Sequence, residues 1–430
     1  MHHRATVLVL LVLAFVLPLV YAETAHAIPA FSRQYKTECS TCHTIYPELN
    51  EYGQAFQKNG YVYTIKPKAE AKTTPAKGEA GQVQAASSEK NEGLLLAGIP
   101  ELLPVSFTAT QSIAYNEHGP GGDNWNFDTR SLMLQAGGSF RELAGFYLTY
   151  NLFSHAENST QDESGKIDEL FVMWRRLFTS PINLKFGKFE PKLSLWKKND
   201  NILPTPLATS AFTVGDFSLQ TPQDALEANA VLADRIFVAA GIVDVKGQND
   251  KNGYGHVSVK FGGADMLGNE PEIDLEKESL WDYLTLSLAL YGYVGRNAQP
   301  AGSTFRNDFY RVGGDMDLLY KRVRLRFSGV TGRDTNPQYT EPGTVQHPLL
   351  LAAEAQYLFG SPINVIGLFR YEHVDSGTGT VNRYIPAVAY IPLQNVKLVL
   401  EYIHEDGPEA DASSITGFNN TVLLDVSYSF

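Results

Sequence analysis

Two cysteines and one histidine stand together near the start of the chain. Cys39 and Cys42 are separated by two residues, and His43 follows the second cysteine directly. This C-x-x-C-H run is the pattern of c-type haem attachment, because two thiols at this spacing can form thioether bonds to the haem vinyl groups. The adjacent imidazole can then ligate the iron from one side. The sequence therefore predicts one covalently bound haem c, attached at Cys39 and Cys42 and ligated by His43.

Three other roles of the cysteine pair fit less well. The chain has only 2 cysteines, and in an exported protein a disulfide between them would be common. The C-x-x-C-H spacing points to haem attachment instead. A thioredoxin-like redox pair would require a surrounding βαβ pattern, and a zinc site would require further cysteine or histidine ligands nearby. The segment has neither.

The second axial ligand of the iron does not follow from the motif. No methionine lies between the motif and the end of the linker that follows it, which excludes a cytochrome with Met and His ligands inside this small segment. Met133, Met173 and His26 are the candidates for the distal ligand. Met side chains also fill gaps without any ligand role. A five-coordinate or water-bound iron is the alternative.

The residues after the motif predict a short helix. Pro47 is acceptable in a first helical turn, and Leu49, Tyr52 and Phe56 recur at the spacing of one helical face. This apolar face would lie against the porphyrin, although ordinary helix packing would explain the same spacing. We expect a small, mainly α-helical haem-binding segment over residues 28–65 that acts as a plug.

The segments on either side of residues 28–65 have different compositions. Residues 1–27 read as a secretory signal peptide, because their apolar run is too short for a membrane-spanning helix. Cleavage after Ala27 fits the A-x-A pattern better than cleavage after Ala22, and only the latter would retain His26. Residues 66–92 are rich in Ala, Lys, Glu, Thr and Gln without any aromatic residue, which predicts a flexible linker.

Residues 93–430 are predicted to form an outer-membrane porin-like β-barrel. They contain about sixteen segments of alternating hydrophobicity, which start at Val105 and end on the aromatic Phe430. Tight turns such as Asp234-Arg235 alternate with longer polar connections, the arrangement of bacterial outer-membrane barrels. The predicted fold class is therefore all-β, an antiparallel transmembrane barrel of about 16 strands preceded by the small haem segment. A soluble sandwich or propeller is the less favoured alternative.

The strand register directs a set of charged residues toward the lumen of this barrel. Such residues usually line water and brace one another, so none is assigned a catalytic role. They are Glu169, Arg175, Lys185, Asp315, Asp317, Arg324, Arg326, Arg370, Glu372, Lys397 and Glu401.

Charge and histidine placement limit the partners. With 35 basic against 47 acidic residues, the chain lacks the basic excess that binding to nucleic acid requires.

Six histidines are expected at the extracellular side, where they and loop carboxylates such as Glu405 and Asp406 could attract ferrous iron. The simpler explanation is that surface loops are polar. The six are His118, His155, His256, His347, His373 and His404.

The chain resembles the fused monohaem cytochrome and porin proteins of iron-oxidising bacteria. The resemblance lies in residues 28–34, in Cys39-Ser40-Thr41-Cys42-His43, in Tyr46-Pro47-Glu48-Leu49, in residues 53–61 and in the barrel that follows. It implies an electron conduit that connects an extracellular donor or acceptor, such as iron, with a periplasmic carrier such as a soluble c-type cytochrome. The residues before Cys39 and the long linker depart from the family pattern.

Two other functions remain open at the level of the sequence. The first is a diffusion porin in the outer-membrane lipid whose haem segment acts as a plug or sensor. The second is a haem enzyme such as a peroxidase, which lacks a convincing distal His and Arg pair. Whether the protein is an iron-oxidising or iron-reducing oxidoreductase depends on the direction of electron flow.

Overall fold

The structure is a computed structural model of the 430-residue chain. It describes Phe31, Tyr35 and residues 37–62, 105–116, 125–140, 143–155, 162–245, 248–271, 279–298, 304–360, 364–407 and 420–430. The predicted signal peptide with His26, the predicted linker and His118 lie outside these residues.

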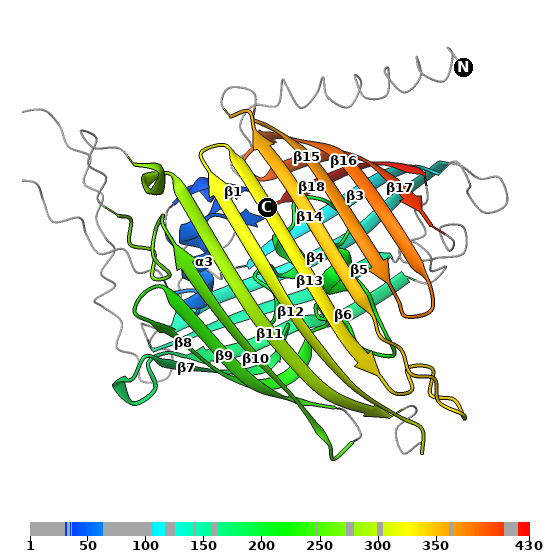
Figure 1. The fold of residues 1–430 in the computed structure, drawn as a ribbon. Helices are drawn as coiled ribbons and strands as arrows, with labels where there is room; N and C mark the ends of the chain where they lie inside the picture. Colours follow the sequence, from blue (N-terminus) through cyan, green and yellow to red (C-terminus); the bar gives the residue numbers. More distant parts are fainter. Residues whose placement is uncertain are drawn as a thin grey trace, which may run out of the picture.

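Sixteen antiparallel strands form one closed barrel, as the alternation of the sequence predicts (Figure 1). The first eight are β3 (Val105–Asn116), β4 (Trp125–Phe140), β5 (Ala144–His155), β6 (Asp162–Trp174), β7 (Ile182–Phe189), β8 (Gln223–Leu232), β9 (Ile236–Asp244) and β10 (Lys251–Phe261). The others are β11 (Leu284–Ala298), β12 (Arg306–Tyr320), β13 (Val323–Asp334), β14 (Leu349–Leu358), β15 (Val365–Asp375), β16 (Thr380–Leu393), β17 (Val396–Asp406) and β18 (Thr421–Ser429). The barrel closes where β18 pairs with β3.

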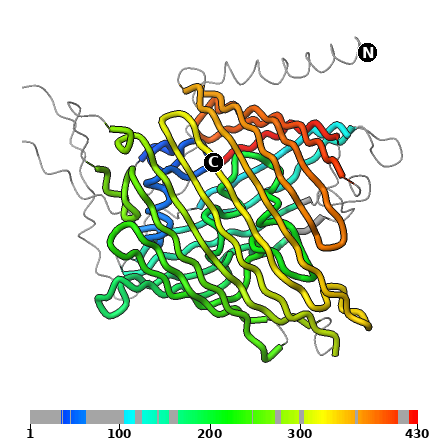
Figure 2. The backbone as a smooth tube through the Cα atoms, in the orientation of Figure 1, coloured from blue at the N-terminus to red at the C-terminus, as the bar shows by residue number. Residues whose placement is uncertain are grey.

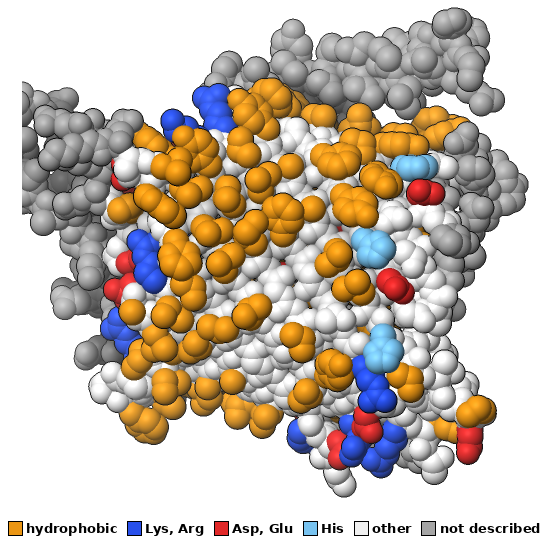
Figure 3. Space-filling view, viewed as in Figure 1, with side chains coloured by type: hydrophobic (Ala, Val, Ile, Leu, Met, Phe, Trp, Pro, Cys, Tyr) orange, Lys and Arg blue, Asp and Glu red, His pale blue; other side chains and the backbone are white. Residues whose placement is uncertain are grey.

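The strands form because their side chains alternate between lumen and exterior with a period of two. Along β14, Leu349 and Leu351 are exposed, whereas Leu350, Ala352 and Glu354 are buried. Hydrophobic side chains cover the face of the barrel seen in Figure 3, and charged side chains gather toward its two ends. An apolar outer band of this kind suits the hydrocarbon core of a membrane.

The two ends of the barrel differ. Short turns join the strands at one end, here called the turn end, and longer connections lie at the other, the loop end. The exception at the turn end is the connection between β10 and β11, which is long. No helix among the described residues is long and apolar enough to cross a membrane.

The N-terminal segment lies at the turn end of the barrel (Figures 1 and 2). This segment, here called the plug, comprises residues 37–62 with Phe31 and Tyr35. It contains the 3-10 turn η1 (Cys39–Thr41), the short strands β1 (His43–Ile45) and β2 (Glu48–Leu49), and the helix α3 (Glu51–Lys58).

Contacts of the plug are spread around the barrel wall. The Tyr46 hydroxyl forms hydrogen bonds to Thr108 of β3 (3.2 Å) and Ser429 of β18 (2.8 Å), so the plug spans the seam where the barrel closes. On the opposite side, Glu51 forms an ion pair with Lys260 of β10 at 2.8 Å.

The connection between β7 and β8 folds into the lumen. This inward loop, residues 190–222, contains the 3-10 turn η4 (Lys198–Asp200) and the short helix α4 (Ala208–Ala211). Its Ile202 and Leu203 pack among buried lumen residues such as Ile385 and Ile403. The lumen therefore holds an apolar core, which the prediction of a polar, porin-like interior did not include.

All the charged residues predicted to face the lumen are buried, which confirms the register. Several of them hold the inward loop. Asp315 accepts hydrogen bonds from Ser194 Oγ (2.8 Å) and from the Leu195 amide (2.7 Å), and Glu372 accepts one from the Ala208 amide (2.8 Å). Their role is to satisfy loop donors in a buried environment.

Candidate functional site

The 3-10 turn η1 positions the two cysteines. The Cys42 amide donates to the Cys39 carbonyl at 3.1 Å, which turns the chain so that both side chains reach one pocket. The Cys39 amide donates to Gln394 Oε1 of the β16–β17 turn, also at 3.1 Å, and so ties the motif to the barrel. Cys39 and Cys42 are not joined by a disulfide.

The hairpin of β1 and β2 fixes the orientation of His43. The chain reverses at Tyr46 and Pro47, and the Pro47 carbonyl lies 3.1 Å from His43 Nδ1. With a proton on Nδ1 for this bond, Nε2 is the nitrogen that can ligate a metal. Burial lowers the pKa of His43, against smaller opposing effects of Pro47 and Glu48, and favours the neutral imidazole that binds metals.

Helix α3 packs directly on the motif. It begins at Glu51, after Asn50 caps it by accepting a hydrogen bond from the Gly53 amide at 2.9 Å. The prediction that Pro47 lies in the first helical turn was wrong, because Pro47 is needed in the turn that orients His43. A Cβ atom at Gly53 would lie 2.0 Å from the Cys42 carbonyl oxygen, so only glycine allows this approach.

Cys39, Cys42 and His43 line one pocket, as the motif predicts. The other walls are largely apolar and aromatic, with rings in contact: Phe31 and Tyr61 have centroids 5.4 Å apart, and Tyr61 stacks on Tyr147 of β5 at 4.9 Å. The lining residues further include Tyr35, Tyr46, Pro47, Leu49, Gly53, Phe56, Ser106, Gln135, Ala136, Gly137, Asn199 and Asp200.

The environment of Cys42 favours its neutral thiol. Burial, with a smaller contribution from Cys39, raises the pKa of the Cys42 thiol to about 11. Redox-active cysteine pairs have lowered thiol pKa values, so this environment argues against a thioredoxin-like site. Among the described residues, no group of three or more His, Cys, Asp or Glu side chains could hold a metal ion, which gives no support to a zinc site.

The donor set and walls of this pocket fit a haem c. Two cysteines without a disulfide and an imidazole with a fixed tautomer face one space, and aromatic rings surround it. These are the groups that covalent attachment, axial ligation and burial of a porphyrin require.

The two candidates for the distal ligand that the structure describes, Met133 and Met173, do not line this pocket. Met133 lies two residues from the lining residue Gln135, and its sulfur accepts a hydrogen bond from Gln135 Nε2 at 3.7 Å. Met173 lines a separate small cavity near Lys185, where Asn229 donates to its sulfur at 3.7 Å. His26 lies outside the described residues.

Glu48 connects the plug to the charged wall of the lumen. It is 1% exposed, forms ion pairs with Arg324 and, at 2.7 Å, with Arg326, and accepts a hydrogen bond from Gln356 at 3.0 Å. Because Glu48 follows Pro47 directly, this ion-pair cluster also holds the hairpin that carries His43.

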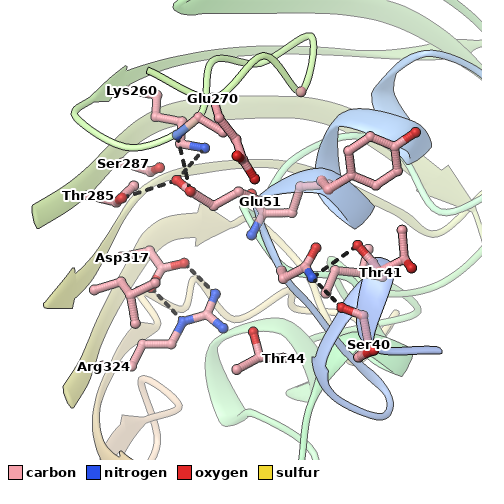
Figure 4. A pocket seen from close by; sticks show the side chains of 17 residues that line it. Ser40, Thr41, Thr44, Glu51, Lys260, Glu270, Thr285, Ser287, Asp317 and Arg324 are labelled. Atoms are coloured by element: carbon pink, nitrogen blue, oxygen red, sulfur yellow. Dashed lines mark hydrogen bonds and ion pairs between the residues drawn. The ribbon is translucent and has the colours of Figure 1, made fainter. Parts of the chain in front are cut away.

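A second cavity, of about 580 Å³, lies beside the motif at the turn end (Figure 4). Ser40 and Thr41, which separate the two cysteines, line it together with Glu51 and Glu270. The long connection after β10 forms part of its wall, since the Ala264 amide donates to Glu51 Oε2 at 3.1 Å. This explains why one connection at the turn end is long: it holds the plug.

The histidines are only partly where the sequence predicts them. His347 is exposed in the β13–β14 connection, whereas His373 and His404 lie near the loop ends of β15 and β17. His256 was wrongly predicted at the extracellular side, since it lies in the middle of β10 and is 4% exposed inside the lumen. Glu405 is likewise a buried strand residue, paired with Arg383, and not a loop carboxylate.

Sequence reasoning missed the inward loop and its contribution to the pocket. Asn199 and Asp200 line the pocket although they are separated from His43 by more than a hundred positions of chain. The available signal was length, because a connection spanning residues 190–222 is longer than a surface loop without function usually is.

The chain is similar to a known porin over part of its length. No protein-family model matches the chain. Porin O of Pseudomonas aeruginosa is 29% identical to it over 153 residues, which are 35% of this chain and 33% of Porin O. The match thus spans about a third of the length of that protein.

Solved porin structures share the fold of the chain at low sequence identity. The anion-selective porin from Comamonas acidovorans has a TM-score of 0.55 and 12% identity, covering 76% of this chain and 98% of that one. OmpF of Salmonella typhi in complex with daunomycin has a TM-score of 0.52, 12% identity, and coverage of 76% and 97%. The DcaP channel of Acinetobacter baumannii has a TM-score of 0.50, 13% identity, and coverage of 76% and 96%. The chain therefore has the porin-like fold of an outer-membrane β-barrel.

Proposed function

We propose that this protein is an outer-membrane cytochrome-porin that carries electrons through a single haem c. The haem is attached to Cys39 and Cys42 and ligated by His43. The observation that carries this proposal is the convergence of two cysteines without a disulfide and an oriented imidazole in one aromatic pocket. Bound there, the haem supplies one-electron oxidation and reduction of its iron.

The barrel supports a transfer between two compartments. The apolar exterior suits the outer membrane, so the turn end faces the periplasm and the loop end faces the outside. The plug and the inward loop both fill the lumen, which favours passage of electrons over passage of solutes. Extracellular iron or another redox substrate is the partner at the loop end.

The periplasmic side offers an approach to the site. The open cavity beside Ser40 and Thr41 lies at the turn end next to the two cysteines. A soluble electron carrier such as a c-type cytochrome could approach the segment that carries the two cysteines there.

The test is electron transfer across a lipid membrane. Proteoliposomes containing the full chain receive ferrous iron outside and an electron acceptor inside, and the rate of acceptor reduction is measured. The matched control is the Cys39→Ala, Cys42→Ala double variant, which retains the barrel. We expect covalent haem and transmembrane electron transfer for the natural chain only. Equal rates for the two proteins would refute the proposal.

A diffusion porin with a plug is the second candidate, favoured by the porin-like fold. It requires a solute path through the lumen. Single-channel conductance in planar bilayers distinguishes the two functions: a diffusion porin gives large, steady conductance, whereas the proposed electron conduit gives little conductance and rapid electron transfer.

A further inference from the structure

The inward loop reaches the pocket that holds Cys39, Cys42 and His43. Its 3-10 turn η4 packs against β2 of the plug, and Asn199 and Asp200 from this turn line the pocket. Buried hydrogen bonds to Asp315 and Glu372 hold the loop on either side of η4. The loop therefore forms a fixed wall of the pocket opposite the plug.

Asp200 is the single charged side chain among the described residues that line this pocket. The remaining lining residues are thiols, one imidazole, aromatic and aliphatic groups, hydroxyls and amides. One Asp200 oxygen, Oδ2, accepts a hydrogen bond from the Lys197 amide at 3.2 Å. The Lys197 ammonium is engaged elsewhere, since it binds both oxygens of Glu169 at 2.8 and 3.0 Å.

The charge of Asp200 acts in a poorly solvated place. Burial raises the pKa of the Asp200 carboxyl, while the positive charges of Lys197, Lys192 and Arg326 act against that rise. Asp200 is partly buried, and in such a place a fixed charge acts on its neighbours more strongly than it would in water. Oxidation of a haem iron adds one positive charge, so a nearby carboxylate stabilises the oxidised state and lowers the reduction potential.

We propose that the inward loop is part of the cofactor site and that Asp200 lowers the reduction potential of the bound haem. This inference rests on the proposed function, because it requires a haem at Cys39 and Cys42. The inference assigns a second role to the inward loop, which otherwise only fills the lumen. In this role the loop places one negative charge, that of Asp200, at a pocket with no other charged side chain among its described lining residues.

The test is a redox titration of the purified full-length protein carrying Asp200→Asn, followed by its absorption spectrum. Asparagine keeps the shape of the side chain and an oxygen for the Lys197 amide, but removes the charge. We expect a more positive midpoint potential, and tighter binding of cyanide if the iron has an open position. Asp200→Glu should bring the potential back toward the natural value. The titrations are repeated at increasing pH, because only the ionised carboxylate carries the charge and a raised pKa moves its ionisation to higher pH.

Asp216→Asn is the matched control. This residue belongs to the same loop and accepts a hydrogen bond from Tyr339 at 2.9 Å, but it does not line the pocket. The Asp216→Asn variant should have the same midpoint potential as the natural protein. Heat-dependent mobility on gels confirms that each barrel is folded, and Asp200→Ser replaces Asp200→Asn if the latter does not insert.

The outcomes separate this inference from the proposed function. Absence of covalent haem in the natural protein would refute the proposed function itself. Covalent haem with the same midpoint potential in the natural protein and in the folded charge-removing variant would overturn only the role of Asp200. An equal shift in Asp216→Asn would also overturn it, because the effect would then be one of overall charge.

Discussion

Glu48 shows at the level of a single residue how the plug is held. Its carboxylate is almost fully buried and compensated by Arg324, Arg326 and Gln356 from the barrel. Arg324 is also bound by Asp317, so this arginine keeps one acidic partner if Glu48 is changed. The pairing is specific, because a buried carboxylate without these cations would be strongly unfavourable.

Glu48→Gln should loosen the plug. Removing one member of a buried ion pair costs roughly 3–5 kcal/mol, and here the cost falls on plug docking while the barrel hydrogen bonds remain. We expect the plug to become accessible to added protease and the ion conductance in bilayers to rise. Glu270→Gln, at an exposed position in the second cavity, is the control. It should change neither the protease accessibility of the plug nor the ion conductance. Unchanged protection in Glu48→Gln would show that the ion pairs do not anchor the plug.

Helix α3 shows what the sequence could and could not predict about an element. The spacing of Tyr52 and Phe56 correctly indicated a helix after the motif, whereas Leu49, predicted on the same helical face, lies in β2 before the helix begins. Its start was misplaced because Pro47 is as acceptable in a tight turn as in a first helical turn. Only the three-dimensional contact between His43 and the Pro47 carbonyl explains which of the two occurs.

Gly53→Ala tests the contact between this helix and the motif. In an unconstrained helix, alanine would stabilise by roughly 0.5–1 kcal/mol relative to glycine. Here the added methyl group would overlap the Cys42 carbonyl, so we expect the opposite sign. The variant should show a less protected plug and less covalent haem per chain. Gln54→Ala, which adds no atom, serves as control, and equal behaviour of the two variants would contradict the predicted overlap.

The inward loop could not be predicted from the periodicity of hydrophobic residues. Strands can be predicted from alternating hydrophobicity, and this alternation predicted the barrel strands and the turns between them. The loop mixes Ile202 and Leu203 with lysines and acidic residues and follows no period. Its position depends on hydrogen bonds to side chains such as Asp315, more than a hundred residues away. For the same reason the contribution of Asp200 to the pocket could not be predicted.

At the scale of the whole molecule, the apolar outer band of the barrel makes a membrane the suitable environment for the protein. Strand residues that point outward are mostly apolar, with Leu290 of β11 66% exposed and Val312 of β12 53% exposed. Such a surface would associate in water, whereas lipid accommodates it. The sequence indicated this band correctly, because the outward and inward residues follow directly from the strand register.

Leu290→Arg should impair insertion into lipid. An arginine on the lipid face near the middle of the membrane costs roughly 2–4 kcal/mol, whereas the cost near an interface is about 0–1 kcal/mol. Phe178→Arg in the turn after β6, where the side chain is 91% exposed, is the matched control. Urea-dependent folding into lipid vesicles measures both variants. Equal losses of folding free energy in the two variants would contradict the assignment of Leu290 to the lipid-facing band.

The position of Tyr46 across the seam between β3 and β18 bears on the order of biogenesis. The first and last strands meet only when the whole chain has been delivered, and they meet beside the plug. Once they have paired, Cys39 is enclosed by protein. An enzyme that attaches a cofactor would reach these thiols while the barrel is still open. We therefore expect cofactor attachment to precede closure, so that the finished barrel seals a site already loaded.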